Sequence, residues 1–169
     1  MKQYTLEFNT LNLKVKKSPF IIRLITYVLS FSFFVFPVLG VIVSIAGGGG
    51  MHIGYFFAIG LFGLLGFYLL RVSLWNTYGE EIIDFLPNKI IYEANYGWFK
   101  DAKKEIELIH PQYSHKSVGY EEDNEAVLII TCGNAEIETV VKLPLIQVQE
   151  LISVLNNSTI SAGAETVRV

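Results

Sequence analysis

The chain has few charged residues and a single cysteine, and both shortages exclude classes of protein. Only 17% of its 169 residues are charged, against about 25% in an average soluble domain. Cys132 has no second cysteine to pair with, which excludes a disulfide framework and a multi-cysteine metal cluster. Hydrophobic residues make up 51% of the chain, which excludes a disordered polypeptide because disorder requires low hydrophobicity.

Charge is absent altogether from residues 24–70, and this gap divides the chain into three parts. Residues 1–23 hold five basic side chains and one acidic side chain, a net charge of +4. Residues 71–169 hold eight basic and fifteen acidic side chains, a net charge of −7. The three parts predict three different environments, and the acidic last part argues against nucleic acid as a partner.

The uncharged part contains two apolar runs, and we expect each to be a membrane-spanning helix. The runs cover residues 24–46 and 53–70, and the predicted helices cover residues 20–46 and 53–75. At about 1.5 Å of rise per residue, each run is long enough for a hydrocarbon core of about 30 Å. The glycine-rich residues 47–52 form a short loop, so the helices must be antiparallel neighbours. Pro37 predicts a kink in the first helix.

Basic residues flank the two runs at the ends away from the loop, at Lys14, Lys16, Lys17, Arg23 and Arg71. Positively charged flanks stay in the cytoplasm, so both termini are predicted to be cytoplasmic and residues 47–52 extracytoplasmic. We expect a multi-pass protein of a bacterial inner (cytoplasmic) membrane. An alternative is a signal peptide cleaved after Ser44-Ile45-Ala46, but this apolar run is longer than the usual signal core of about 7–15 residues.

The second apolar run contains four candidate helix-packing residues, Gly54, Gly60, Gly63 and Gly66. Small residues let helices approach closely. Two interpretations stay open: packing against the first helix, or docking of another membrane protein, as an immunity or regulatory protein would do. Residues 24–46 and 53–70 contain no Asp, Glu, Lys, Arg or His, which argues against a proton relay or an ion path.

Residues 79–157 have the pattern of an antiparallel β domain followed by a helix. Alternating or continuous apolar patterns predict strands over 80–85, 89–95, 104–109, 125–131 and 135–141, with a weaker one near 114–120. An apolar stripe then predicts an amphipathic helix with Pro144 in its first turn and an end at 156–157. The stripe is Leu145, Val148, Leu151, Ile152 and Leu155. Residues 158–169 are predicted to be a disordered tail.

Residues 1–18 are predicted to form an N-terminal β-hairpin. Tyr4, Leu6 and Phe8 alternate with polar residues, and a second alternation follows after Asn9. A lone hairpin is marginally stable in water. We therefore expect it to add to the sheet of the β domain, and the alternative is that it lies on the bilayer surface.

The order of a two-helix hairpin, several antiparallel strands and one C-terminal helix resembles small bacterial membrane proteins with a cytoplasmic pleckstrin-homology-like (PH-like) domain. The segments that carry the resemblance are 75–79, 80–95, 96–99 and 143–155. The resemblance implies an α+β domain, with a PH-like β barrel or sheet capped by the amphipathic helix. It also implies a membrane scaffold or assembly role without catalysis.

An aromatic loop and the lysines that follow it are the candidate contact site for a partner protein or for lipid. Aromatic side chains commonly anchor protein interfaces, and lysines attract anionic headgroups. The residues are Tyr96, Trp98, Phe99, Lys100, Lys103 and Lys104. Two alternatives stay open: Trp98 and Phe99 could fill one end of the β domain, and the chain could be an anionic-lipid surface sensor, which its acidic charge opposes.

The sequence predicts no catalytic, cofactor-binding or metal-ligating residues. His110, His115 and Glu107 are close in sequence but lack the further ligands of a usual zinc site. Cys132 has no local signature of a nucleophile, and no phosphate-binding loop or nucleophile-elbow motif is present. We expect a non-enzymatic membrane scaffold whose partners are the lipid bilayer and another protein, with homo-oligomerisation left open.

Overall fold

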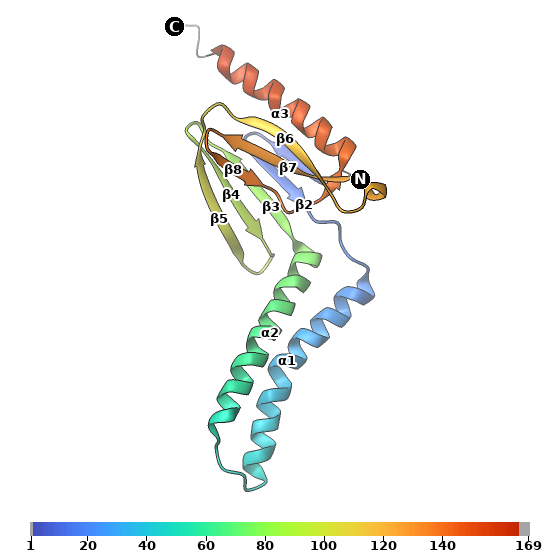
Figure 1. The fold of residues 1–169 in the computed structure, drawn as a ribbon, viewed down its shortest axis with the longest axis vertical. Helices are drawn as coiled ribbons and strands as arrows, with labels where there is room; N and C mark the ends of the chain where they lie inside the picture. Colours follow the sequence, from blue (N-terminus) through green and yellow to red (C-terminus); the bar gives the residue numbers. More distant parts are fainter. Residues whose placement is uncertain (1, 166–169) are drawn as a thin grey trace. The chain divides into compact units, whose positions relative to one another are not determined.

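The computed structural model describes residues 2–165, and the chain forms two units (Figure 1). The β domain comprises residues 1–15, 80–95 and 99–169. The helical hairpin comprises residues 16–79 together with residues 96–98. Residues 96–98 were expected in a loop of the β domain, but the structure groups them with the hairpin.

The helical hairpin consists of two helices, α1 (Phe20–Ala46) and α2 (Ile53–Tyr78). They have 27 and 26 residues and mean hydropathies of 2.5 and 2.0, so both are long and apolar enough to cross a membrane. The second helix extends three residues beyond the predicted end at residue 75. Figure 1 shows that α1 is bent. A bend is expected because the helix contains Pro37, which has no backbone N–H to donate to the carbonyl four residues earlier.

The two helices pack closely around Gly66. The Ser30 hydroxyl, which is fully buried, donates a hydrogen bond to the Gly66 carbonyl at 2.7 Å. The rings of Phe33 and Phe62 stack nearby, with centroids 5.6 Å apart. These contacts confirm that the helices are adjacent, as the short loop requires.

Five antiparallel strands form the first sheet of the β domain, in the order β1-β2-β3-β4-β5. The strands are β1 (Tyr4–Glu7), β2 (Thr10–Lys14), β3 (Glu80–Phe85), β4 (Lys89–Asn95) and β5 (Lys100–Glu107). Strand β2 pairs with β3, with Leu11 opposite Ile83. The predicted addition of the N-terminal hairpin to the sheet is therefore confirmed.

The second sheet is built around β7 (Glu125–Cys132). Strand β6 (Gln112–Val118) lies on one side of β7, and β8 (Ala135–Glu138) and β9 (Leu143–Pro144) both pair with β7 on the other. A short 3-10 turn, η1 (Glu121–Asp123), connects β6 to β7. Leu128 and Ile130, which are fully buried, make β7 the central strand that its continuous apolar run predicted.

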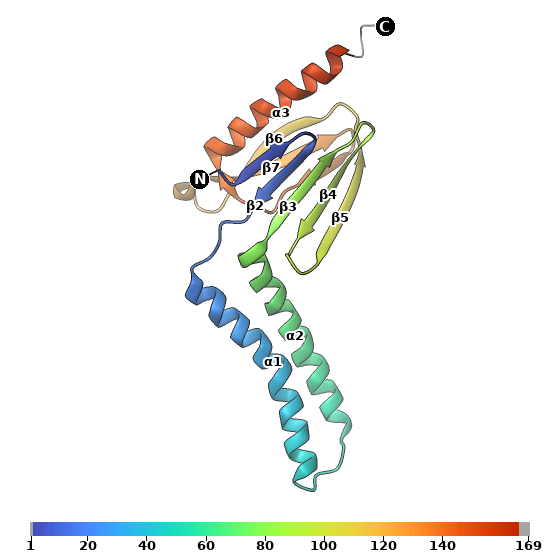
Figure 2. The same ribbon diagram turned by 180° about the vertical axis from the view of Figure 1, so that it is seen from behind.

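The C-terminal helix α3 (Leu145–Glu165) packs against β6 and β7 (Figure 2). Val148, Leu151 and Leu155 are buried, which confirms the predicted stripe. Two details differ from the prediction: Pro144 belongs to β9 rather than to the helix, and the helical backbone continues to Glu165, through residues expected to be disordered. No proline follows Pro144 to interrupt the helix. Residues 166–169 of the predicted tail lie outside the described part.

The two sheets do not close into a barrel, so the barrel form of the predicted fold is wrong, while the α+β class with antiparallel sheets agrees with the structure. Strands β5 and β6 follow one another in the sequence, and each is an edge strand of its own sheet. They do not pair with each other. Residues 108–111 between them include His110 at φ +43 and Pro111. A left-handed residue followed by a residue without an N–H interrupts an extended strand, so the chain leaves one sheet and starts another.

A buried carboxylate connects the first sheet to the segment after β8. Glu81 is fully buried, and its Oε1 accepts hydrogen bonds from Tyr92 Oη at 2.5 Å and from the Val140 N–H at 2.7 Å. Its Oε2 accepts a third from the Val141 N–H at 3.0 Å. Burial raises the pKa of Glu81, and the hydrogen bonds from Tyr92, Val140 and Val141 oppose that rise.

Candidate functional site

Tyr96, the first residue of the predicted aromatic site, is buried against α2. The Arg71 Nε–H donates a hydrogen bond to Tyr96 Oη at 3.0 Å, and the guanidinium carbon lies 4.9 Å from the ring centroid. The Trp75 ring also packs against Tyr96, and the two ring centroids are 5.0 Å apart. Tyr96 thus holds residues 96–98 to the last turns of α2 and leaves little surface for a partner.

Gly97 lets the chain turn directly after Tyr96. Its φ is +86, and a Cβ at this position would lie 2.8 Å from the Tyr78 Cβ. No other residue type fits both the left-handed backbone and the close approach. The turn leaves Trp98 with 63% of its surface exposed. Of the three predicted aromatic residues, Tyr96 is buried, Phe99 is half-buried in the β domain, and Trp98 is exposed.

The three predicted lysines each contact an oxygen of the β domain. Lys100 pairs with Glu93 at 2.8 Å and Lys103 with Glu105 at 3.0 Å. Lys104 Nζ donates to the Glu136 carbonyl at 2.5 Å. The hydrogen bond to Glu93 raises the pKa of Lys100. Two of these charges are therefore already balanced by carboxylates, which weakens the case for an anionic-lipid site here.

The structure reveals another exposed surface that the sequence did not predict, formed by turns at one end of the first sheet. The β1–β2 and β3–β4 turns lie side by side there, because the Phe85 N–H donates to the Asn9 carbonyl at 2.8 Å. The segment after β5 joins them, because the Leu108 N–H donates to the Asn88 carbonyl at 3.0 Å. We call the exposed apolar residues of these turns the turn patch, which consists of Phe8, Leu86 and Ile109.

Phe8 is the most exposed member of the turn patch and has an unfavourable backbone. It occupies the first position of the two-residue turn between Glu7 and Thr10, with φ +52 and a fully exposed side chain. Glycine or asparagine is usual where such a turn needs a positive φ. The alternation of Tyr4, Leu6 and Phe8 placed this residue on a strand, and the adjacent Asn9 was the only signal of the turn.

Of the four predicted helix-packing glycines, only Gly66 lies at the contact between α1 and α2. A Cβ on Gly66 would lie 2.9 Å from the Phe34 ring and 3.2 Å from the Phe33 Cβ. A Cβ on Gly54, Gly60 or Gly63 would meet nothing within 4 Å. Packing within the hairpin therefore accounts for Gly66 and not for the other three.

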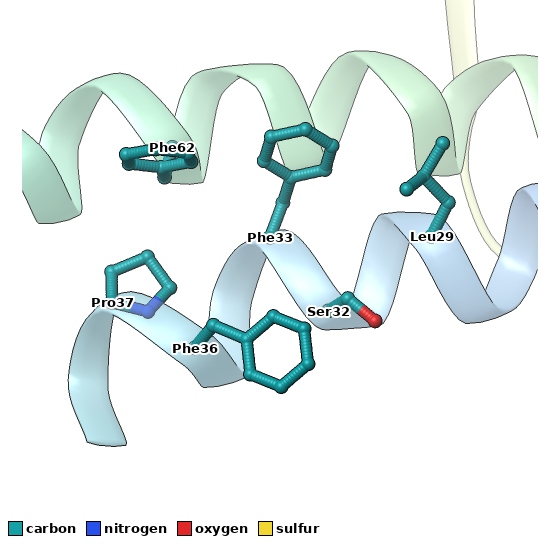
Figure 3. Close-up of a pocket in the computed structure, with 6 residues that line it drawn as sticks. All are labelled: Leu29, Ser32, Phe33, Phe36, Pro37 and Phe62. Carbon is teal, nitrogen blue, oxygen red and sulfur yellow. The ribbon is translucent and has the colours of Figure 1, made fainter. Parts of the chain in front are cut away.

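An apolar groove of about 340 Å³ opens on the surface of the hairpin near Pro37. Figure 3 shows Phe33 extending from α1 toward α2, with Phe62 of α2 above Pro37. The one hydroxyl at the groove, that of Ser32, donates to the Val28 carbonyl at 2.8 Å. The groove thus offers apolar surface, and its polar group is already satisfied.

The residues considered for catalysis or metal binding do not form a cluster. His110 and His115 are exposed, and Cys132 is buried at the end of β7. Burial raises the pKa of the Cys132 thiol, which disfavours the nucleophilic thiolate. Within residues 2–165, no group of three or more His, Cys, Asp or Glu side chains could hold a metal ion.

Comparisons of the chain with protein-family models, with curated proteins and with solved structures found no match.

Proposed function

We propose that the chain is a non-enzymatic, membrane-anchored protein that binds a partner protein through its β domain. In this proposal α1 and α2 span a bacterial inner membrane with both termini in the cytoplasm. The β domain, PH-like in its order of strands followed by a C-terminal helix, presents the turn patch to the partner.

The observation that carries this proposal is the position of Phe8. A non-glycine residue in the left-handed region costs about 1–2 kcal/mol. Phe8 accepts this strain and gains no burial, since its side chain is fully exposed. Strained residues persist mainly where they serve function, and exposed aromatic side chains are frequent anchors of protein interfaces. Leu86 and Ile109, which are 39% and 49% exposed, extend the apolar surface around it.

Charge favours a protein partner over an anionic membrane at the turn patch. Residues 71–169 carry a net charge of −7. Acidic side chains border the patch at Glu7, Asp84 and Glu107, and Asp84 accepts a hydrogen bond from Thr10 at 2.6 Å. These carboxylates would repel negative lipid, whereas a protein with an apolar pocket and a basic rim would complement them.

Site-specific photo-cross-linking in native membranes tests the proposal. A photoreactive phenylalanine analogue replaces Phe8 in the full-length chain, and the matched control places it at Gln149, an exposed residue of α3. We expect a single protein adduct of defined mass from position 8 and none from position 149. Leu86→Asp should reduce the yield of that adduct about tenfold. This corresponds to a loss of about 1.4 kcal/mol of binding free energy, as expected when one interface anchor is removed.

A third placement, at Trp98, separates the turn patch from the aromatic site predicted from the sequence. An adduct from position 98 but not from position 8 would move the partner to the aromatic loop. Absence of an adduct from both positions would overturn the proposed function.

A further inference from the structure

The loop that connects β4 to β5 returns to the helical hairpin. Strand β4 ends at Asn95 and β5 begins at Lys100, but residues 96–98 between them belong to the hairpin unit. These three residues are a tyrosine, a glycine and a tryptophan, and they carry no charge. The hairpin unit therefore includes an uncharged segment from outside its two helices. We call this segment the returning loop.

Contacts within the hairpin unit place the returning loop beside the last part of α2. Tyr96 contacts Arg71 and Trp75. Gly97 lies close to Tyr78, since a Cβ on Gly97 would be 2.8 Å from the Tyr78 Cβ. From Arg71 to Tyr78 the helix rises about 10 Å, at about 1.5 Å per residue. This part of α2 directly follows the uncharged part of the chain. In a bilayer it would cover the headgroup layer, which is about 5–8 Å thick on each side of the hydrocarbon core.

Trp98 is the exposed side chain of the returning loop, with 63% of its surface accessible. An indole combines a broad apolar ring with one N–H donor, and tryptophan and tyrosine are enriched where membrane meets water. Two other aromatic residues of the hairpin unit, Tyr78 at the end of α2 and Phe20 at the start of α1, are more than half exposed. The Ser18 N–H donates to the Asn76 carbonyl at 3.4 Å, which places the start of α1 beside the end of α2. The three aromatic side chains therefore belong to the same end of the hairpin.

We propose that Trp98 is a membrane anchor whose indole lies in the headgroup layer of the bilayer that α1 and α2 span. Tyr96 and Gly97 are the positioning residues, since the first binds the loop to α2 and the second lets the chain turn. A lipid surface is favoured over a protein partner because the loop is uncharged and continues the exposed apolar surface of the hairpin. This inference rests on the part of the proposed function in which the hairpin spans a membrane. It does not depend on partner binding at the turn patch.

Depth-dependent quenching of tryptophan fluorescence tests the anchor. The chain has two tryptophans, so Trp75→Phe leaves Trp98 as the only reporter and keeps an aromatic ring beside Tyr96. The full-length variant is reconstituted in vesicles of phosphatidylcholine that carries bromine at either a shallow or a deep position of the acyl chain. We expect the shallow bromines to quench Trp98 about twofold more strongly than the deep bromines, because an interfacial side chain lies near the headgroups.

Two other positions of a single tryptophan calibrate the measurement, each in a chain that also carries Trp75→Phe and Trp98→Phe. Leu64→Trp replaces an exposed residue near the middle of α2, and we expect the deep bromines to quench it more than the shallow ones. Tyr120→Trp replaces an exposed aromatic residue of the β domain that is followed by the acidic residues 121–123. We expect little quenching of this reporter by either lipid.

Tyr96→Ala in the Trp75→Phe chain tests the positioning of the loop. It removes the hydrogen bond from Arg71 and the ring contact at position 75, so the shallow quenching of Trp98 should fall about twofold. The same substitution should leave the deep quenching of Leu64→Trp unchanged, which shows that the hairpin still inserts. Unchanged quenching of Trp98 in Tyr96→Ala would overturn the positioning role of Tyr96.

Three results would overturn the anchor: no quenching of Trp98 while Leu64→Trp is quenched, equal quenching of Trp98 and Tyr120→Trp, or stronger quenching of Trp98 by the deep bromines. A protein adduct from a photoreactive group at position 98 would also overturn it, because Trp98 would then contact a partner. Absence of deep quenching in Leu64→Trp would overturn the membrane span and the anchor together. Cross-linking from position 8 should be equal in Trp98→Ala and the natural sequence, so failure of the anchor and failure of partner binding are distinguishable.

Discussion

The guanidinium of Arg71 lies over the ring of Tyr96 and also donates its Nε–H to the hydroxyl of that ring. One side chain thus makes a cation–π contact and a hydrogen bond to the same residue, 25 positions further along the chain. The contact fixes residues 96–98 on the hairpin and determines that Trp98, rather than Tyr96, is exposed.

Removing the Tyr96 hydroxyl should loosen this loop without unfolding the hairpin. Tyr96→Phe deletes the acceptor for Arg71 Nε but keeps the ring, so we expect a loss of about 1–2 kcal/mol in the stability of the loop contact. Tyr96→Ala also removes the contact with Trp75 and should cost more. Hydrogen exchange of amides 96–98 measures the effect. Equal protection in the Tyr96→Phe variant and the natural sequence would contradict the role of the hydroxyl.

Glu81 should tolerate an amide better than a truncation. Glu81→Gln can keep a carbonyl oxygen for Tyr92 and Val140 but presents an N–H₂ to the Val141 N–H, at a cost of about 1–3 kcal/mol. Glu81→Ala leaves all three donors without their acceptor and should destabilise the protein more. Thermal unfolding of the full-length chain in detergent micelles measures both. The order of the two variants, with Ala below Gln, is the decisive result.

The stability of the protein should depend on pH through Glu81. Because burial raises the pKa of Glu81 above its ordinary value of 4.5, the folded state binds this proton more tightly than the unfolded state. The contribution of Glu81 to stability is therefore fully present below pH 4.5 and is lost as the pH rises through the raised pKa. The difference in unfolding free energy between the natural sequence and Glu81→Gln isolates this group. A difference that grows with pH would contradict the sign.

Alanine should distinguish Gly66 from the other glycines of α2. Gly66→Ala introduces a Cβ 2.9 Å from the Phe34 ring, and such overpacking costs about 1–3 kcal/mol. Gly60→Ala meets nothing within 4 Å and should stabilise the helix by up to about 1 kcal/mol through its higher helix propensity. Thermal unfolding in micelles compares the two. A lower melting temperature for Gly60→Ala than for Gly66→Ala would contradict the packing described for the hairpin.

Phe8→Gly should make the protein more stable and a weaker binder. Glycine adopts a positive φ without strain, so the substitution should relieve about 1–2 kcal/mol, and no buried contact is lost because Phe8 is fully exposed. With the photoreactive group placed at Ile109, the yield of the partner adduct should fall in this variant. A variant that is destabilised would show that Phe8 supports the fold instead.

Local pattern was enough to predict much of the fold. The uncharged stretch 24–70 predicted two helices long enough for a membrane, because that many apolar residues without a charge are rare elsewhere. Alternation predicted β3 at Glu80–Phe85 and β4 at Lys89–Asn95 with the observed bounds, and the stripe through Leu151 predicted α3. These features depend on residues that are neighbours in sequence, so the sequence by itself determined them.

Tertiary contacts decided the candidate sites. Tyr96, Trp98 and Phe99 look alike in the sequence, but Arg71 buries the first and Gly97 exposes the second. The alternating pattern predicted that Phe8 lies on a strand. It lies in the turn instead, because Glu7 pairs with Thr10 and only two residues remain to connect them. Two sheets replaced the expected barrel because β5 and β6 do not pair. Each outcome depends on which distant residues meet, and periodicity along one segment carries no information about that.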